Sequence, residues 1–156
     1  MRVVSIPSQD PVRPRPSLRL TSYCIGLGLW LTGVLWLVFH SFLQRQTDFG
    51  LHPHPFEFWW RAAHGFFGFF SLWAAGFFWG THILRAWKSG HHRATGSVLF
   101  GLLVWLSGTG YLLYYLGNER LLTAVALLHW SVGLLLPVPF LIHRFAAGVV
   151  GPGDQR

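Results

Sequence analysis

The sequence predicts an all-α protein, an antiparallel four-helix transmembrane bundle. Of its 156 residues, 52% are hydrophobic and only 11% are charged, whereas a soluble domain carries about 25% charged residues. The apolar residues also gather in long blocks, each close to the roughly 20 residues that cross the hydrocarbon core of a bilayer. The four blocks are Leu18–Phe42, Glu57–Trp87, Ala94–Leu116 and Arg120–Phe145.

The first predicted helix is Leu18–Phe42. Its apolar run exceeds the roughly 7–15 residues of a signal-peptide core, and no small-residue cleavage site follows it, so we expect a retained anchor. Residues 1–17 are rich in Pro and Arg and lack an apolar period, which predicts a flexible cytoplasmic arm. A loop with a His-Pro-His-Pro run is predicted from Gln44 to Phe56.

The second predicted helix begins at Glu57, and a short basic loop over residues 88–93 leads to the third. A Gly-Asn pair at 117–118 predicts a tight turn before the fourth helix, which ends in a cytoplasmic tail over residues 147–156. The predicted membrane domain therefore spans residues 18–146, with no internal repeat and no second domain. Aromatic belts typical of membrane interfaces are formed by Trp59, Trp60, Tyr111, Tyr114 and Tyr115.

The basic residues indicate membrane topology. The net charge is +7, and nine of the twelve Lys and Arg residues lie in the N-terminal arm, the central loop region and the C-terminal end. The other three lie in the regions that hold Asp48, Glu57 and Glu119. This asymmetry follows the positive-inside rule for an even number of crossings. It predicts a multi-pass protein of the cell inner membrane with both termini cytoplasmic, and no nucleic-acid partner.

Two of the apolar blocks each carry a pair of histidines on one helix face. His64 and His82 are eighteen residues apart, and His129 and His143 are fourteen apart. At 100° per residue both spacings return to nearly the same face, with axial separations of roughly 27 Å and 21 Å. Facing helices with such pairs favour two stacked b-type haems, one between His64 and His129 and one between His82 and His143.

Several alternatives stay open around these histidines. One histidine in lipid is a functional candidate, but it is equally well satisfied by a carbonyl or hydroxyl of a neighbouring helix. His40, near the end of the first block, is an alternative outer ligand or a partner of a haem propionate or quinone headgroup. Arg61 either neutralises a propionate or snorkels to the interface. The small residues of the histidine faces either leave room for a macrocycle or permit close helix packing; they are Gly68, Ser71, Ala75 and Gly133.

Five stretches of the sequence resemble membrane b-type cytochromes. LHWSVGLLLPVPFLIHRF at 128–145 resembles the fourth helix of the cytochrome b561 group and of the gamma subunits of formate dehydrogenases and nickel-iron hydrogenases. The other four stretches are similar to the small flavinylation-associated cytochromes (DUF4405). They are WLVFH at 36–40, AHG at 63–65, THILRAW at 81–87 and TGYLLYYLG at 109–117.

The resemblance covers about residues 25–145 and implies four helices that hold two b haems. It implies His64, His82, His129 and His143 as ligands, and electron flow between quinone and a partner redox protein. The b561 and gamma-subunit pattern places a ligand near the cytoplasmic end of the first helix. This chain has Tyr23, Cys24 and glycines there, so His82 would supply the inner ligand instead.

The expected function is that of a dihaem b-type cytochrome that carries electrons across the membrane, with two haem b groups and a quinone as a further candidate ligand. Such a chain is an electron-transfer subunit, a candidate part of a quinone-linked oxidoreductase, and no catalytic residue is predicted. One alternative is a cofactor-free membrane protein, either a histidine-using metal or proton carrier or an assembly subunit. Another is a one-haem protein in which His40 or His64 pairs with His129.

Overall fold

A computed structural model describes residues 16–48, 50–84, 87 and 93–149, without the side chains of residues 81, 82 and 146–149. The chain is mostly helical, as the sequence predicts. Most of the predicted basic loop, nearly all of the N-terminal arm and most of the C-terminal tail lie outside the described residues; Arg93, the last residue of the predicted loop, begins the next helix. The elements are α1 (Pro16–Phe42), β1 (Arg45–Thr47), β2 (Gly50–His52), α2 (Pro55–Phe78), the π-helical turn η1 (Trp79–Ile83), α4 (Arg93–Tyr115), α5 (Glu119–Leu135) and α6 (Pro137–Val149).

Three helices of the described part are long and apolar enough to cross a membrane. They are α1, α4 and the stretch Glu119–Phe145, which α5 and α6 form together. Large apolar side chains cover their outer surfaces, an arrangement that suits lipid rather than water. The helix α2 has a suitable length of 24 residues, but its Trp and Gly residues, with Arg61 and His64, lower its mean hydropathy.

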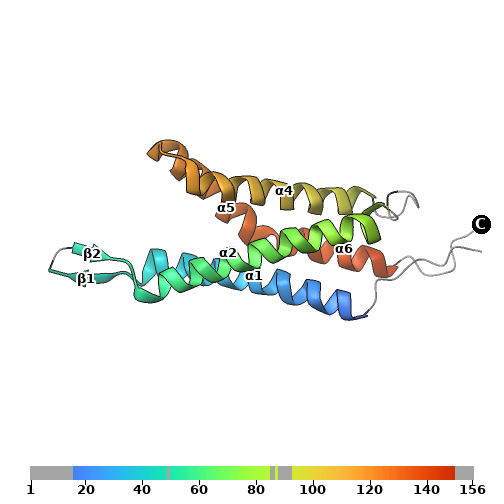
Figure 1. Cartoon of the computed structure of the whole chain (residues 1–156), viewed down its shortest axis with the longest axis horizontal. Coiled ribbons are helices and arrows are strands. Elements are labelled where there is room, and N and C mark those ends of the chain that lie inside the picture. The colour runs from blue at the N-terminus through green and yellow to red at the C-terminus, as the bar shows by residue number, and fades with distance from the viewer. Residues whose placement is uncertain (1–15, 49, 85–86, 88–92, 150–156) are drawn as a thin grey trace, which may run out of the picture.

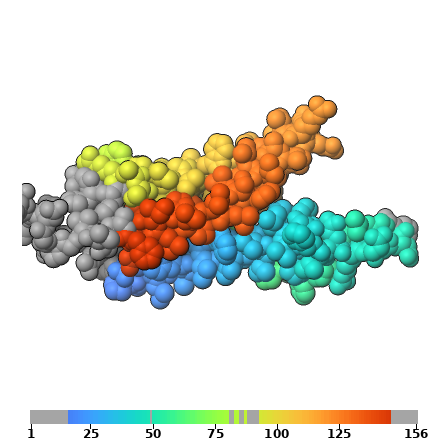
Figure 2. Space-filling model, turned by 180° about the vertical axis from the view of Figure 1, so that it is seen from behind, coloured from blue at the N-terminus to red at the C-terminus, as the bar shows by residue number. Residues whose placement is uncertain are grey.

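The helices form two pairs that lie side by side (Figure 1). In one pair α2 runs back along α1, and in the other α5 and α6 run back along α4. The pairs meet where the Trp30 indole N–H donates to the Leu134 carbonyl at 3.4 Å. Seen from behind, they diverge toward the end that holds the β-hairpin and the α4–α5 turn (Figure 2).

Local hydrogen bonds explain where the helices begin. The hairpin from Arg45 to His52 turns through Gly50, whose φ of 106° favours glycine. The helix α2 begins at Pro55, two residues before the predicted start, because the His54 ring Nδ1 caps it by accepting the Phe56 N–H at 3.2 Å. The predicted turn before α5 is a cap of the same kind, with the Asn118 side chain accepting the Leu121 N–H at 3.1 Å.

Two irregular turns interrupt the long helices. Pro137 follows a break at Leu136 between α5 and α6, since proline lacks the N–H that would continue the helix. The π-helical turn η1 contains His82. A π turn does not keep the 3.6-residue period, on which the expected shared face of His64 and His82 depends. The side chain of His82 itself lies outside the described part of the chain.

Polar side chains are the most buried ones. Among the described residues no apolar side chain is buried, whereas Thr32, Thr109 and Glu57 are only 6%, 6% and 7% exposed. A buried hydroxyl or carboxylate is costly unless it is hydrogen-bonded. The residues that hydrogen-bond to these three side chains therefore show where polar groups gather inside the bundle.

Candidate functional site

Two of the predicted histidines lie together between the helix pairs. The rings of His64 on α2 and His129 on α5 have centroids 6.2 Å apart and planes that cross at 88°. Both residues are half-buried. The helices that carry them belong to different pairs, so residues 65 positions apart in the chain form one site.

The ring of His64 is held by α1. Its Nδ1 lies 3.0 Å from the Leu29 carbonyl oxygen and 3.4 Å from the Thr32 hydroxyl. Because a carbonyl can only accept, Nδ1 carries the proton and Nε2 keeps the lone pair. The Thr32 hydroxyl donates to the Gly28 carbonyl at 2.7 Å, so its lone pairs are directed to the ring.

The ring of His129 is held by α4 in the same way. Its Nδ1 lies 2.9 Å from the Thr109 hydroxyl, which itself donates to the Trp105 carbonyl at 2.8 Å. A hydroxyl has one proton. With that proton on the Trp105 carbonyl, the hydroxyl accepts from Nδ1–H and Nε2 of His129 keeps the lone pair, which is the tautomer that we assign to the ring. The backbone of Leu106 also interacts with this ring.

Glycines bring each histidine close to the opposite helix. A Cβ on Gly33 would lie 2.9 Å from Cε1 of His64, and one on Gly110 would lie 3.3 Å from Cε1 of His129. Two of the small residues left open in the sequence now have a clear role, because Gly68 and Gly133 each face a leucine of the partner helix at 3.9 Å. In the structure these two glycines lie in the packing contact between neighbouring helices.

These contacts form a unit that occurs twice. One helix carries Leu-x-x-Thr-Gly and its partner carries His-x-x-x-Gly, and the leucine packs over the second glycine. The expectation of no internal repeat missed this pattern, although LWLTG and LSGTG are visible in the sequence. The first copy is Leu29, Thr32, Gly33, His64 and Gly68, and the second is Leu106, Thr109, Gly110, His129 and Gly133.

A third threonine–histidine contact lies further along the second helix pair. The Thr95 hydroxyl is 2.8 Å from Nδ1 of His143, and a Cβ on the following Gly96 would be 3.7 Å from Cε1 of that ring. Thr95 and Thr109 are fourteen residues apart, as are His129 and His143. Antiparallel helices keep such a spacing in register, so α4 holds both histidines with the same dipeptide.

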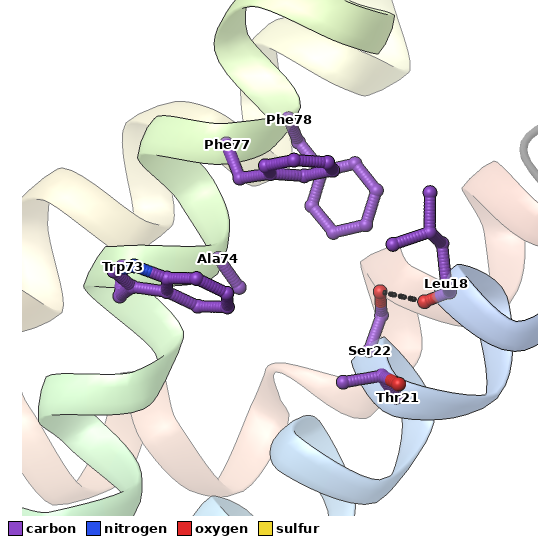
Figure 3. A pocket seen from close by; sticks show the side chains of 7 residues that line it. All are labelled: Leu18, Thr21, Ser22, Trp73, Ala74, Phe77 and Phe78. Atoms are coloured by element: carbon purple, nitrogen blue, oxygen red, sulfur yellow. Dashed lines mark hydrogen bonds between the residues drawn. The ribbon is translucent and has the colours of Figure 1, made fainter.

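The first helix pair has a different environment at the corresponding position. Fourteen residues before Thr32 stands Leu18, and fourteen after His64 stands Phe78. Both line an apolar cavity of about 220 Å³ between α1 and α2, with the aromatic rings of α2 on one side (Figure 3). The two hydroxyl-bearing residues of the wall belong to α1; they are Thr21 and Ser22.

The other predicted site residues lie apart from the ring pair. His40 donates from Nδ1 to Oε1 of Glu57 at 2.8 Å and stacks on Trp36 with ring centroids 5.0 Å apart. Arg61 is exposed on the first half of α2. The pairing of His82 with His143 involves a side chain outside the described residues.

No known protein family, curated protein or solved structure matches this chain. The resemblance to membrane b-type cytochromes therefore depends on the residues quoted for it.

The side chains at the ring pair that could bind a metal are the two imidazoles of His64 and His129. Within the described residues, no group of three or more His, Cys, Asp or Glu side chains is placed to hold a metal ion. Two imidazoles are too few ligands for a bare zinc ion, which takes four. They are a complete axial set for a metal whose other ligands come from a macrocycle.

The two imidazoles have the chemistry of such a ligand pair. Their ring centroids are 6.2 Å apart, and each ring has Nδ1 hydrogen-bonded to a neighbouring helix. His64 and His129 would therefore be the residues that hold a metal whose remaining ligands come from a macrocycle.

Proposed function

We propose that this chain is a b-type cytochrome of the membrane, an antiparallel four-helix bundle that binds haem b between His64 and His129. The observation that carries the proposal is the pair of neighbouring imidazoles from the two helix pairs, each with Nδ1 hydrogen-bonded to the other helix of its own pair and Nε2 left with its lone pair. An Nδ1–H bonded to an oxygen is the usual way in which proteins orient a metal-binding histidine.

A second haem near the other side of the membrane is part of the proposal. His143 is held by Thr95 as His129 is held by Thr109, and fourteen residues separate the two histidines by roughly 21 Å along the helices. His82 is the proposed partner of His143. Two groups at this spacing would cover most of the hydrocarbon core, which is about 30 Å thick.

Electron transfer is the function that this ligand set favours. Haem would supply one-electron chemistry when it is bound, and two histidine ligands favour electron transfer over oxygen activation. The residues of the chain would contribute the two ligands, His64 and His129, their orientation and an apolar surround. We propose that electrons pass between a quinone pool and a partner redox protein, in a cell inner membrane with both termini cytoplasmic and α2 as the fourth crossing.

The test is haem content. The chain is purified in mild detergent after expression with ample haem, and a pyridine haemochrome assay and reduced-minus-oxidised spectra are recorded. We expect about two b haems per chain, and the loss of one of them in His64→Ala and in His129→Ala. The matched control is His52→Ala, because His52 is exposed in the β-hairpin and its removal should leave the haem content unchanged.

Other haem contents would contradict or narrow the cytochrome proposal. Wild-type protein without haem, or a His129→Ala variant with the wild-type haem content, contradicts the cytochrome proposal and favours a cofactor-free membrane protein. One haem that depends on His64 and His129 supports the ring pair and removes the second haem from the proposal.

A further inference from the structure

We propose that Thr109 and Thr32 are positioning residues of the repeated unit, which hold the imidazoles of His129 and His64 in the tautomer and orientation for binding through Nε2. The proposal rests on the proposed function, because it concerns the same two rings. It adds residues that lie outside the ligand set and that the histidine pattern of the sequence does not indicate.

The burial of the two threonines points to this role. Each is only 6% exposed, so each hydroxyl needs hydrogen-bond partners within the protein. The proton goes to a helix carbonyl four residues back, at 2.7 Å for Thr32 and 2.8 Å for Thr109. The lone pairs of the hydroxyl then face the imidazole N–H of the partner helix.

Two hydroxyls elsewhere in α4 and α5 show that a hydrogen bond to a helix carbonyl does not by itself place a hydroxyl against a histidine. Thr123 and Ser107 also donate to carbonyls four residues back, at 2.9 Å and 2.7 Å, and the structure gives neither of them a histidine partner. Thr32 and Thr109 combine that bond with deep burial, a histidine contact and a following glycine. These three features together distinguish Thr32 and Thr109 from the other two hydroxyls and place them at the histidine site.

The glycine that follows each threonine restricts the position of the histidine ring on a second side. On one side of the imidazole Nδ1 is bonded, and next to it Cε1 lies against Gly33 or Gly110. The ring therefore cannot turn about its own axis without losing the bond or moving the helix. The two rings are held in this way against different helices, α1 and α4, and their planes cross at 88°.

The two copies of the unit are not equally dependent on their threonines. At His64 the Leu29 carbonyl is the nearer acceptor, 3.0 Å from Nδ1 against 3.4 Å for the Thr32 hydroxyl. At His129 the Thr109 hydroxyl is at 2.9 Å. The Leu106 backbone also interacts with the His129 ring. Removing the hydroxyl should still affect His129 more than His64, because the threonine hydroxyl lies closer to Nδ1 of His129 than to Nδ1 of His64.

The experiment compares Thr109→Val, Thr32→Val and Thr123→Val with the wild-type haem-loaded protein. Valine keeps the shape of threonine and removes the hydroxyl. The measurements are the rate of haem loss to an excess of acceptor apoprotein, the midpoint potential of each haem, and the ferric low-spin EPR signal, which depends on the angle between the axial imidazole planes.

We expect Thr109→Val to lose haem about 10–100-fold faster, since that is the usual cost of removing a partner of a metal-binding histidine. Its midpoint potential should rise, because an imidazole without the Nδ1 hydrogen bond is a weaker donor to the ferric state, and its EPR signal should shift. Thr32→Val should change less, Thr123→Val should match the wild type, and Thr109→Ser should restore the wild-type values.

The outcomes separate this proposal from the function on which it rests. Wild-type protein without haem overturns both. A haem-loaded Thr109→Val variant whose haem loss, potential and EPR signal match those of Thr123→Val overturns the positioning role and leaves the cytochrome in place. If the Thr109→Val protein does not accumulate in the cell, the Thr32→Val protein is measured in its place. A midpoint potential and an EPR signal equal to those of the wild type in Thr32→Val then overturn the proposal.

Discussion

His40 and Glu57 form a polar contact at the end of the α1–α2 pair that no cofactor is needed to explain. Oε1 of Glu57 accepts from Nδ1 of His40 at 2.8 Å, and the Glu57 side chain is buried while His40 is exposed. A buried carboxylate that loses its partner keeps the full cost of desolvation. The contact therefore gives His40 a structural role.

This role leads to a prediction for His40→Ala. The variant should lower the free energy of unfolding in detergent by about 1–3 kcal/mol, because one oxygen of Glu57 loses its donor. The haem content should stay at the wild-type value, since His64 and His129 are the proposed ligands of the outer haem. Thermal unfolding and the haemochrome assay measure both quantities, with His52→Ala as the control. A lost Soret band would instead make His40 a haem ligand.

The histidines of the site were predictable from sequence and their partners were not. A histidine in an apolar block stands out because a polar ring in lipid must be satisfied. Threonine and glycine are common in membrane helices for packing alone, so Thr32 and Gly33 give no signal by themselves. Only the repetition of Leu-x-x-Thr-Gly in both halves, opposite His-x-x-x-Gly, distinguishes them.

At the scale of the helix, glycine spacing on α1 controls how closely α2 can approach. A Cβ on Gly33 would lie 2.9 Å from the His64 ring, whereas one on Gly26 of the same helix meets nothing within 4 Å. Gly33→Ala should therefore push the ring away and weaken haem binding by about tenfold or more, in the range that second-sphere changes cost.

Gly26→Ala is the matched control for this prediction, because it makes the same change in the same helix and should leave haem binding unchanged. Haem loss to acceptor apoprotein measures the difference between the two variants. Gly110→Ala should have a weaker effect than Gly33→Ala, since its Cβ would lie 3.3 Å from the His129 ring. Equal haem retention in Gly33→Ala and Gly26→Ala would contradict the close contact.

Helix positions follow the sequence closely, because apolar blocks and caps are local signals. The predicted blocks Leu18–Phe42 and Ala94–Leu116 match α1 (Pro16–Phe42) and α4 (Arg93–Tyr115) to within two residues. The β-hairpin and the π-helical turn η1 were not predicted. Both depend on backbone geometry at a few positions, such as the positive φ of Gly50, and not on a run of apolar residues.

At the scale of the whole molecule, the repeated unit divides the chain into two helix pairs of similar design. The α1–α2 pair has a β-hairpin as its connection, and the α4–α5 pair has a short turn capped by Asn118 (Figure 1). Each pair supplies one imidazole to the site. A group bound by both imidazoles would bridge the two pairs, so the proposed haem would also help to hold the halves together.

The number of crossings is the last property to test, because it decides whether both proposed haems lie within one bilayer. Three helices are apolar enough to span it, and α2 is the fourth crossing in our proposal. With four crossings the β-hairpin and the C-terminus lie on opposite sides of the membrane. With three, α2 stays on the side of the hairpin and the C-terminus moves to that side too.

Single cysteines distinguish these topologies. In a Cys24→Ala background, Asp48→Cys marks the hairpin turn and Gln155→Cys marks the C-terminal end. A membrane-impermeant thiol reagent applied to intact cells should label Asp48→Cys, and it should label Gln155→Cys only after lysis, because the proposed orientation places the basic regions in the cytoplasm. Labelling of both in intact cells would show three crossings, and labelling of Gln155→Cys alone would invert the orientation and contradict the positive-inside assignment.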